Sequence, residues 1–287
     1  MLSFDSRHYP YPSRRSVVYA RRGMVATSQP LAAQAGLQAL QAGGNAIDAA
    51  IATAAALTVV EPTANGIGGD AFALVWSGGR LHGLNASGPA PAAISLPALV
   101  AAGLKAMPQF GPLPVTVPGA PSAWRALSER FGNLPLARTL AAAIELAQVG
   151  YPVSPLVSLA WEQAHTQFSE QLKAPHFQPW FDTFAAAGRA PRPGEIWRSP
   201  EHARTLRAIA EDGAEGFYRG ALAEQIAACV RGAGGHLDVA DLAGFSPEWV
   251  TPISVDYRGY DVWEIPPNGH GLVALMALNI LKGFEFS

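Results

Sequence analysis

Few side chains in this sequence are spaced in a way that could support catalysis or metal binding. The seven histidines are scattered, and none lies at zinc-ligand spacing from a cysteine or a carboxylate cluster. The sequence has neither a Gly-x-Ser-x-Gly nucleophile motif nor a phosphate-binding loop with a Walker lysine. We therefore expect no metal ion and no cofactor.

A glycine-rich run, Gly66–Ala71, superficially matches the G-x-G-x-x-A fingerprint of dinucleotide-binding proteins. That fingerprint needs a strand before the glycines and a helix after them, whereas a helix is expected before this run and a strand after it. We interpret the glycines as a tight turn that packs against neighbouring backbone, because glycine has no Cβ.

Three other groups could each have either a structural role or a role in binding or catalysis. The backbone N–H groups of Asn268–Gly271, at the start of the last expected helix, could hold an anion, or could simply begin a helix that packs on the core. Cys229 is the single cysteine, and we expect a small core residue on a helix rather than a catalytic thiol. Asp48 lies three residues after Asn45, so we assign it to helix capping rather than acid catalysis.

The elements that would position these groups begin with a short strand at 24–27 and a helix over 31–42. Gly43 and Gly44 end this helix, because glycine accepts the left-handed conformation at a C-cap. Its glutamines share a solvated face. The residues expected to face inward are Ala33, Leu37 and Leu40.

A second helix is expected from the cap at Asn45 to the residue before Pro62. Small apolar residues lie on all its faces, which predicts that it is enclosed on several sides. The apolar run 71–76 is typical of a strand buried on both faces, and a Gly-Gly turn would join it to a partner strand at 81–85.

The middle of the chain is mainly helical, and strands return near its end. Expected helices are 122–131, 136–148, 155–168, 200–211 and 221–231, with a short helical turn at 238–243. The stretch 173–197 is expected to be irregular. A hairpin over 251–265 turns at Arg258-Gly259, and a nearly all-apolar helix follows at 271–281. That helix needs a cover, for which we expect further sequence or a partner chain.

Composition favours a large core and excludes several function classes. Hydrophobic residues make up 49% of the 287 residues and charged residues 15%, with a formal net charge of −2. No global basic field argues for nucleic acid or an anionic membrane. The arginine-containing segment 1–22 has no apolar core of a secretory signal, so we expect a cytoplasmic protein with a solvated N-terminal extension, or with a basic recognition arm there.

Several motifs in the same order resemble the large-subunit region of the gamma-glutamyltransferase family. These motifs are Gly23–Ala26, the run Gly43–Phe72, Val117–Gly119, Glu215–Gly220, Ala240–Leu242 and Thr251–Tyr260 running into Pro266-Pro267. The resemblance implies an α+β fold with a helix-rich centre, which is part of the layered αββα sandwich of N-terminal-nucleophile hydrolases. It assigns 1–22 to an extension and 23–287 to a large-subunit domain that is incomplete at its C-terminal end.

The resemblance also implies a reaction. In this family the nucleophile is a threonine freed by self-cleavage, whose own α-amine acts as the base. We expect that threonine beyond the stretch covered here, on the C-terminal half of the same precursor. The implied activity is transfer or hydrolysis of gamma-glutamyl groups from glutathione-like amides, and this chain alone is expected to be inactive.

One departure from the family pattern concerns the arginine that grips the substrate α-carboxylate. The corresponding stretch, Gly83–Pro91, contains no arginine, and Asn85 or Pro89 stands at the position, depending on the alignment. Asn85 and Ser87 are our candidate substrate-binding residues, although both could simply end a strand. The alternatives are an acylase of non-glutamyl amides, of the cephalosporin-acylase type, or an inactive, truncated or degenerate family member.

Overall fold

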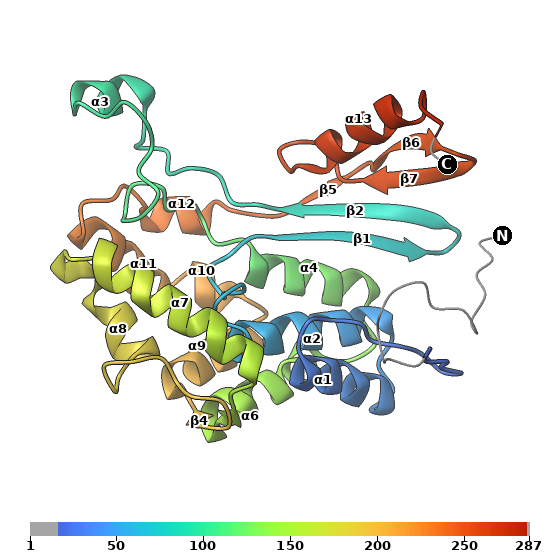
Figure 1. The fold of residues 1–287 in the computed structure, drawn as a ribbon, viewed down its shortest axis with the longest axis horizontal. Coiled ribbons are helices and arrows are strands. Elements are labelled where there is room, and N and C mark those ends of the chain that lie inside the picture. The colour runs from blue at the N-terminus through green and yellow to red at the C-terminus, as the bar shows by residue number, and fades with distance from the viewer. Residues whose placement is uncertain (1–16, 286–287) are drawn as a thin grey trace.

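The computed structural model describes residues 17–285, so residues 1–16 of the expected extension lie outside the described part. Its layers are seen in Figure 1. A thick layer of helices lies on one side of a three-stranded sheet, and a hairpin and a last helix lie on the other. This order of helix, sheet, second sheet and helix confirms the expected α+β class with a helix-rich centre.

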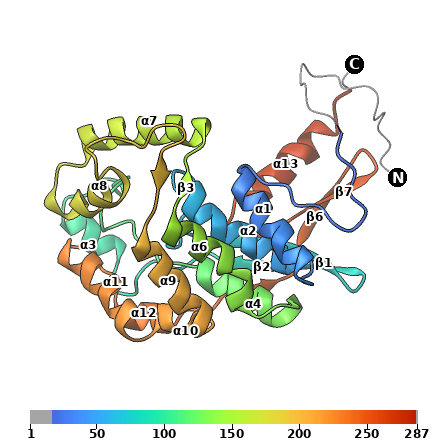
Figure 2. The ribbon, with the colours of Figure 1, turned by 90° about the horizontal axis from the view of Figure 1, so that it is seen from below.

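Helix α2 (Ala46–Val60) lies in the middle of the helical layer, between α1 (Pro30–Gln41) and α6 (Ala141–Val149), as Figure 2 shows. Most of its side chains are buried, which confirms that it is enclosed on several sides. It approaches α1 closely at Gly36, where an added Cβ would lie 2.3 Å from Thr53 Oγ1. Small residues therefore set the distance between the two helices.

This close approach corrects the predicted inward face of α1. Leu37 is 41% exposed, and Ala33 and Leu40 are only partly buried. The residues that face α2 and the core are Ala32, Ala35, Gly36 and Ala39. A leucine would hold the helices apart, so the larger side chains lie beside the contact rather than in it. The expected strand at 24–27 is also wrong, because no described segment pairs with its backbone.

Both ends of the α1–α2 connection have the predicted chemistry. Gly43 takes φ of +92°, and the N–H of Gly44 donates to the carbonyl of Ala39 at 2.9 Å. Asn45 then caps α2, and Asp48 accepts from the Asn45 N–H at 2.8 Å, which completes a capping box.

Asp48 does more than cap its own helix. Its carboxylate is fully buried and also accepts from the backbone N–H of Asn133 at 3.0 Å and of Leu134 at 3.2 Å. Those residues follow the C-terminus of α4 (Ala120–Phe131). One buried anion therefore joins the start of α2 to the end of α4, which lies directly beneath the sheet (Figure 1).

The main sheet has the order β1-β2-β5 and is antiparallel. Strands β1 (Ala71–Ser77) and β2 (Arg80–Ala86) form the predicted hairpin, and both turn glycines have positive φ. Strand β5 (Glu248–Val250), which was not predicted, pairs with the end of β2.

Strand β1 is not buried on both faces as predicted. Its Ala73 and Val75 face the helices, but Phe72, Leu74 and Trp76 are 46%, 39% and 71% exposed. The β6–β7 hairpin and α13 lie on this side of the sheet but leave these three side chains partly exposed, so the apolar run does not reflect a strand enclosed on both faces within the described residues.

The middle and end of the chain follow the prediction closely. The remaining helices are α5 (Leu136–Thr139), α7 (Pro155–Gln171), α9 (Pro200–Glu211), α10 (Glu215–Tyr218), α11 (Ala221–Gly232) and α12 (Val239–Ala243). The expected helix at 136–148 is divided at Leu140 into α5 and α6. Cys229 lies on α11 but is exposed, so its expected place in the core is wrong.

Several short elements were not predicted. They are α3 (Leu96–Ala101), α10, the 3₁₀ turn Pro175–Phe177, α8 (Gln178–Phe184) and the small pair β3 (Tyr151–Pro152) with β4 (Ile196–Trp197). The 3₁₀ turn, α8 and β4 lie in the stretch 173–197, which was expected to be irregular. The second hairpin, β6 (Ile253–Tyr257) with β7 (Tyr260–Glu264), turns at Arg258-Gly259 as expected. The last helix, α13 (Gly271–Leu281), packs on this hairpin and buries only Leu275. No described helix has the length and apolar character that a membrane span requires.

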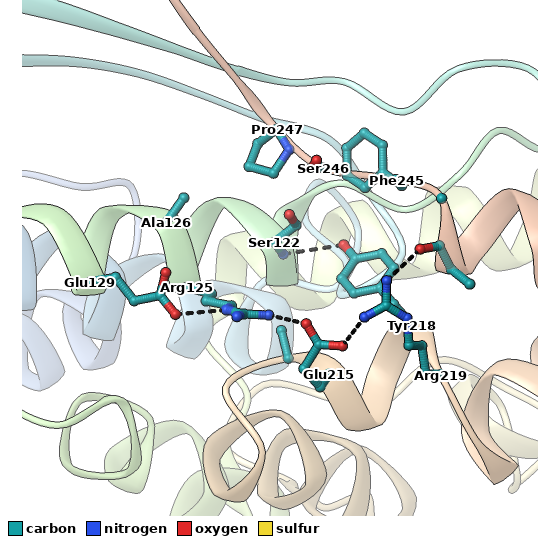
Figure 3. A pocket seen from close by; sticks show the side chains of 13 residues that line it. Ser122, Arg125, Ala126, Glu129, Glu215, Tyr218, Arg219, Phe245, Ser246 and Pro247 are labelled. Carbon is teal, nitrogen blue, oxygen red and sulfur yellow. Dashed lines mark hydrogen bonds and ion pairs between the residues drawn. The ribbon is translucent and has the colours of Figure 1, made fainter.

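Tyr218 joins α10 to the start of α4, as Figure 3 shows. Its hydroxyl donates to the Pro118 carbonyl at 2.6 Å. It also accepts from the Ser122 N–H at 3.1 Å, the contact drawn in Figure 3. Burial raises the pKa of this phenol, so it stays a neutral donor throughout the physiological range.

We expect Asp48→Ala to lower the free energy of unfolding by about 3 kcal/mol or more, because three backbone donors lose a charged acceptor. Chemical denaturation followed by circular dichroism measures this. As a control, Asp238→Ala removes the capping box of α12 at the surface and should cost only about 1 kcal/mol. Equal effects of the two substitutions would contradict the linking role of Asp48.

We expect Tyr218→Phe to cost about 1–3 kcal/mol, because the Pro118 carbonyl and the Ser122 N–H would remain buried without a partner. Thermal and denaturant unfolding measure this loss. Tyr260→Phe, at an exposed position of β7, is the matched control and should leave stability unchanged. An unchanged free energy of unfolding in Tyr218→Phe would show that water replaces the hydroxyl.

Candidate active site

A cavity of about 790 Å³ lies where β2 ends, between the segment that follows it, α12 and the loop before α13. Its wall includes both candidate residues from the sequence, Asn85 and Ser87. The other lining residues are Gly88, Pro89, Ala90, Ala92, Ala240, Asp241, Gly244, Phe245, Ser246, Pro247, Glu248 and Asn268. The two candidates are therefore brought to one concave surface.

Asn85, Ser87 and Asn268 form a closed hydrogen-bond network. Asn85 Oδ1 accepts from the Ser87 hydroxyl at 2.8 Å and from the Ser87 N–H at 2.9 Å. Asn85 Nδ2 donates to Asn268 Oδ1 at 2.8 Å, and Asn268 Nδ2 donates to Ser87 Oγ at 2.7 Å. Each amide thus has a fixed orientation, and the network carries no charge.

Close backbone contacts fix the start of this segment. An added Cβ at Gly88 would lie 1.6 Å from the Val117 carbonyl oxygen, and one at Gly119 would lie 1.8 Å from the Ala86 carbonyl oxygen. The Gly69 carbonyl accepts from the N–H groups of both Gly119 and Ala120 at 2.9 Å. The glycine-rich run before β1 is a turn, as expected. The expected close backbone packing of its glycines is wrong, because an added Cβ at Gly68 would meet nothing within 4 Å; the close approaches are at Gly88 and Gly119 instead.

The charged groups of the cavity are acidic. Asp241 accepts from the Ala92 N–H at 2.9 Å and from the Asp238 N–H at 2.9 Å, so it holds two segments of the wall together. Glu248 is exposed at the start of β5. Among the described residues that line the cavity there is no arginine or lysine. A substrate carboxylate would find no cation on this side of the site.

Two arginines lie nearby in a second cavity of about 350 Å³, which shares the wall Gly244–Pro247 with the first. Figure 3 shows that Arg125 and Arg219 both point at Glu215. The Arg125 guanidinium, and then Arg219, hold the pKa of this carboxyl below its ordinary value. Arg219 also donates to the Ala243 carbonyl at 2.8 Å. Both guanidinium groups are engaged in holding α4, α10 and α12 together.

Among the described residues that line these two cavities, no hydroxyl is hydrogen-bonded to a side chain that could act as its base. Ser87 Oγ donates to one amide and accepts from another, and neither partner is a base that could take its proton. Asp48, which we assigned to capping, lies in the helical layer and does not line the cavity. What these residues can do is bind a polar, uncharged group through amide and hydroxyl contacts.

Sequence reasoning missed Asn268 as the partner of Asn85 and Ser87. It considered Asn268–Gly271 only for the backbone N–H groups at the start of α13, and the use of those groups for an anion stays a prediction. The signal that was available is the Pro266-Pro267 pair, which stops β7 and returns the chain toward the sheet. The contact itself joins residues 183 positions apart.

Comparison with known proteins identifies the family of the chain. The family model for gamma-glutamyltranspeptidase matches residues 32–287. The glutathione hydrolase-like YwrD proenzyme of Bacillus subtilis is 37% identical over 94% of this chain and 50% of its own length. The oxamate amidohydrolase proenzyme of Klebsiella pneumoniae is 38% identical over 90% of this chain and 49% of its own length.

Among solved structures, that of a cephalosporin acylase from Bacillus halodurans superposes with a TM-score of 0.93 and 63% identity, over 99% of this chain and 53% of its own. The chain thus spans about half the length of the curated relatives that it matches. On the family match, the identities and the shared fold, the chain belongs to the gamma-glutamyltranspeptidase family of N-terminal-nucleophile hydrolases and corresponds to its large-subunit region.

Proposed function

We propose that the protein is an amide hydrolase or acyltransferase whose acyl pocket lacks a carboxylate clamp and prefers acyl groups other than gamma-glutamyl. The observation that carries this proposal is the uncharged network of Asn85, Ser87 and Asn268 in the segment where the family resemblance places an arginine. A guanidinium binds a carboxylate through two parallel hydrogen bonds, which amide groups cannot replace with equal strength.

The reaction proposed is acyl transfer through a threonine at the N-terminus of a companion half. Its hydroxyl attacks the amide carbonyl while its own α-amine takes the proton, and the amine of the substrate leaves. Backbone N–H groups stabilise the oxyanion, and water or another amine then releases the acyl group. In this scheme the present chain supplies one wall of the acyl pocket and no reacting atom.

Two observations support a companion half. The chain covers about half of relatives whose printed names call them proenzymes. Its apolar surfaces are also open where the sandwich would continue, at Phe72, Leu74 and Trp76 on β1 and at Val273, Met276 and Ile280 on α13. Apolar surface on this scale is typical of a protein–protein contact.

A second candidate function is gamma-glutamyl hydrolysis or transfer on a glutathione-like substrate. The name of the Bacillus subtilis relative favours it, since that protein is described as glutathione hydrolase-like. In that case a cation for the α-carboxylate would have to come from the companion half. An inactive family member is the third reading, and a companion half with no N-terminal threonine would favour it.

We expect the intact protein to hydrolyse a butyryl anilide with a higher kcat/KM than the glutaryl and gamma-glutamyl anilides, because only the latter two bring a carboxylate to a wall without a cation. Release of the aniline measures all three. A clear preference for the gamma-glutamyl anilide would contradict the proposed specificity and favour the second candidate. Activity on none of them, in a correctly folded protein, would favour the inactive reading.

In the same assay Asn85→Arg should raise kcat/KM for the glutaryl anilide about tenfold or more, since one charge-assisted hydrogen bond contributes about 1.5–3 kcal/mol. Asn85→Leu breaks the same network without adding a charge and is the matched control. If both variants change kcat/KM for the glutaryl anilide equally, position 85 does not face the substrate carboxylate.

The present chain expressed alone should release no aniline above the uncatalysed rate, because no residue in it matches the family's nucleophile. Addition of the separately produced companion half, with threonine at its N-terminus, should restore release. A companion half that begins with alanine in place of that threonine is the control. Catalysis by the chain alone would refute the proposed division of labour.

A further inference from the structure

A cavity of about 400 Å³ under the turn end of the β1–β2 hairpin has a different character from the candidate active site. It is lined by Arg80, His82 and Arg130 together with Leu81, Gly83, Trp249, Val250, Thr251 and Pro252. None of these described lining residues carries a carboxylate. Nothing in the proposed acyl-transfer reaction uses this cavity.

The two arginines come from separate elements and meet at one imidazole. Arg80, on β2, donates from Nε to His82 Nε2 at 3.3 Å. Arg130, in the last turn of α4, brings Nη2 within 3.4 Å of His82 Nδ1. Figure 1 shows α4 directly beneath the hairpin, which is why a helix residue can reach the strand.

Aromatic rings hold the Arg130 guanidinium in place. Its central carbon lies 4.1 Å from the centre of the Trp249 ring and 5.2 Å from that of Phe131. Phe131 in turn packs edge-on against Trp249, with ring centres 5.6 Å apart, and against His82 at 5.1 Å. The cation is therefore positioned before any ligand arrives, which lowers the entropy lost on binding.

The charges of this cluster are not neutralised within the described residues. Neither Arg80 nor Arg130 forms one of the ion pairs found there, and the nearby carboxylate of Glu129 is bonded to Arg125. The carbonyl of Phe131, at the end of α4, already accepts from Asn45 Nδ2 at 2.6 Å. Two guanidinium groups thus share a cavity with no anion from the chain, an arrangement that favours a bound anion.

The cluster is also separate from the acyl pocket. Trp249 pairs across the sheet with Leu84, which is buried against the helices, while Glu248 pairs with Asn85. Because neighbouring residues of a strand point to opposite faces, the cluster and the acyl pocket lie on opposite faces of the β2–β5 pair.

We propose that Arg80, His82 and Arg130 form a binding site for a phosphate group, either inorganic phosphate or the phosphate of a small molecule. A phosphate carries a charge of about −1.5 to −2 at neutral pH and three acceptor oxygens. It can therefore accept from two guanidinium groups on different elements at once, whereas a carboxylate carries a single charge.

The test is isothermal titration of the intact protein with inorganic phosphate, with acetate and chloride at matched ionic strength as comparison ions. We expect saturable phosphate binding that is at least tenfold weaker in Arg130→Gln and in Arg80→Gln, and no saturable binding of acetate. Arg138→Gln, at an exposed site on α5, is the matched control and should bind phosphate like the wild type. Circular dichroism checks that each variant is folded.

Glucose 6-phosphate and glucose then separate a free ion from a small-molecule source. Tighter binding of the sugar phosphate than of inorganic phosphate would assign the site to a phosphorylated metabolite, and equal binding would assign it to the ion itself. The proposal is overturned if phosphate fails to bind the intact protein, if Arg80→Gln and Arg130→Gln bind it unchanged, or if acetate at equal ionic strength gives the same isotherm. Failure of the acyl-transfer proposal would leave these isotherms unaffected.

Discussion

The site depends above all on how closely three stretches of backbone approach one another at Gly69, Gly88 and Gly119. At the last two positions a side chain would overlap a carbonyl oxygen of the facing stretch. The Gly69 carbonyl, with two N–H donors at the start of α4, fixes the turn before β1 to the helix under the sheet. This arrangement fixes the positions of Asn85, near the end of β2, and of Ser87, which follows the strand, because β2 ends where the backbones meet.

Charged side chains link elements of the fold, whereas the wall at Asn85 and Ser87 is built from neutral groups. Asp48, Glu215 and Asp241 each accept from two or more donors on separate segments, and so they hold elements together. The acyl-pocket wall at Asn85 and Ser87 instead uses neutral groups whose orientation is set by mutual hydrogen bonds. In the proposed function, neutral groups at this wall leave the choice of substrate to the shape of the pocket and to what the proposed companion half supplies.

Local signals in the sequence predicted most of the fold. The Asn45–Asp48 capping box, the Gly-Gly turn and the last helix all appear as expected, because each depends on neighbouring residues. Strand β5 has only three residues, which is too short for a pattern of alternating apolar residues to predict it. Its pairing with β2 also joins distant parts of the chain, so no local signal indicates it. Asn85 and Ser87 were chosen as candidates through the family resemblance, and their contacts with Asn268 join residues more than 180 positions apart, which no local pattern indicates. Burial of β1 was misjudged because an apolar run does not show whether both faces of the strand are covered within the same chain.

The free edge of β1 has a consequence for how such a protein is made. Strand β1 pairs with β2 on one side only, and no described strand hydrogen-bonds to its other side. Unpaired N–H and C=O groups beside apolar side chains are a template for pairing with any other extended chain. A segment of the same polypeptide reaches such an edge at an effective concentration in the millimolar range, far above that of an extended segment from another protein. In the proposed function, translation of both halves as one precursor would then protect this edge against aggregation.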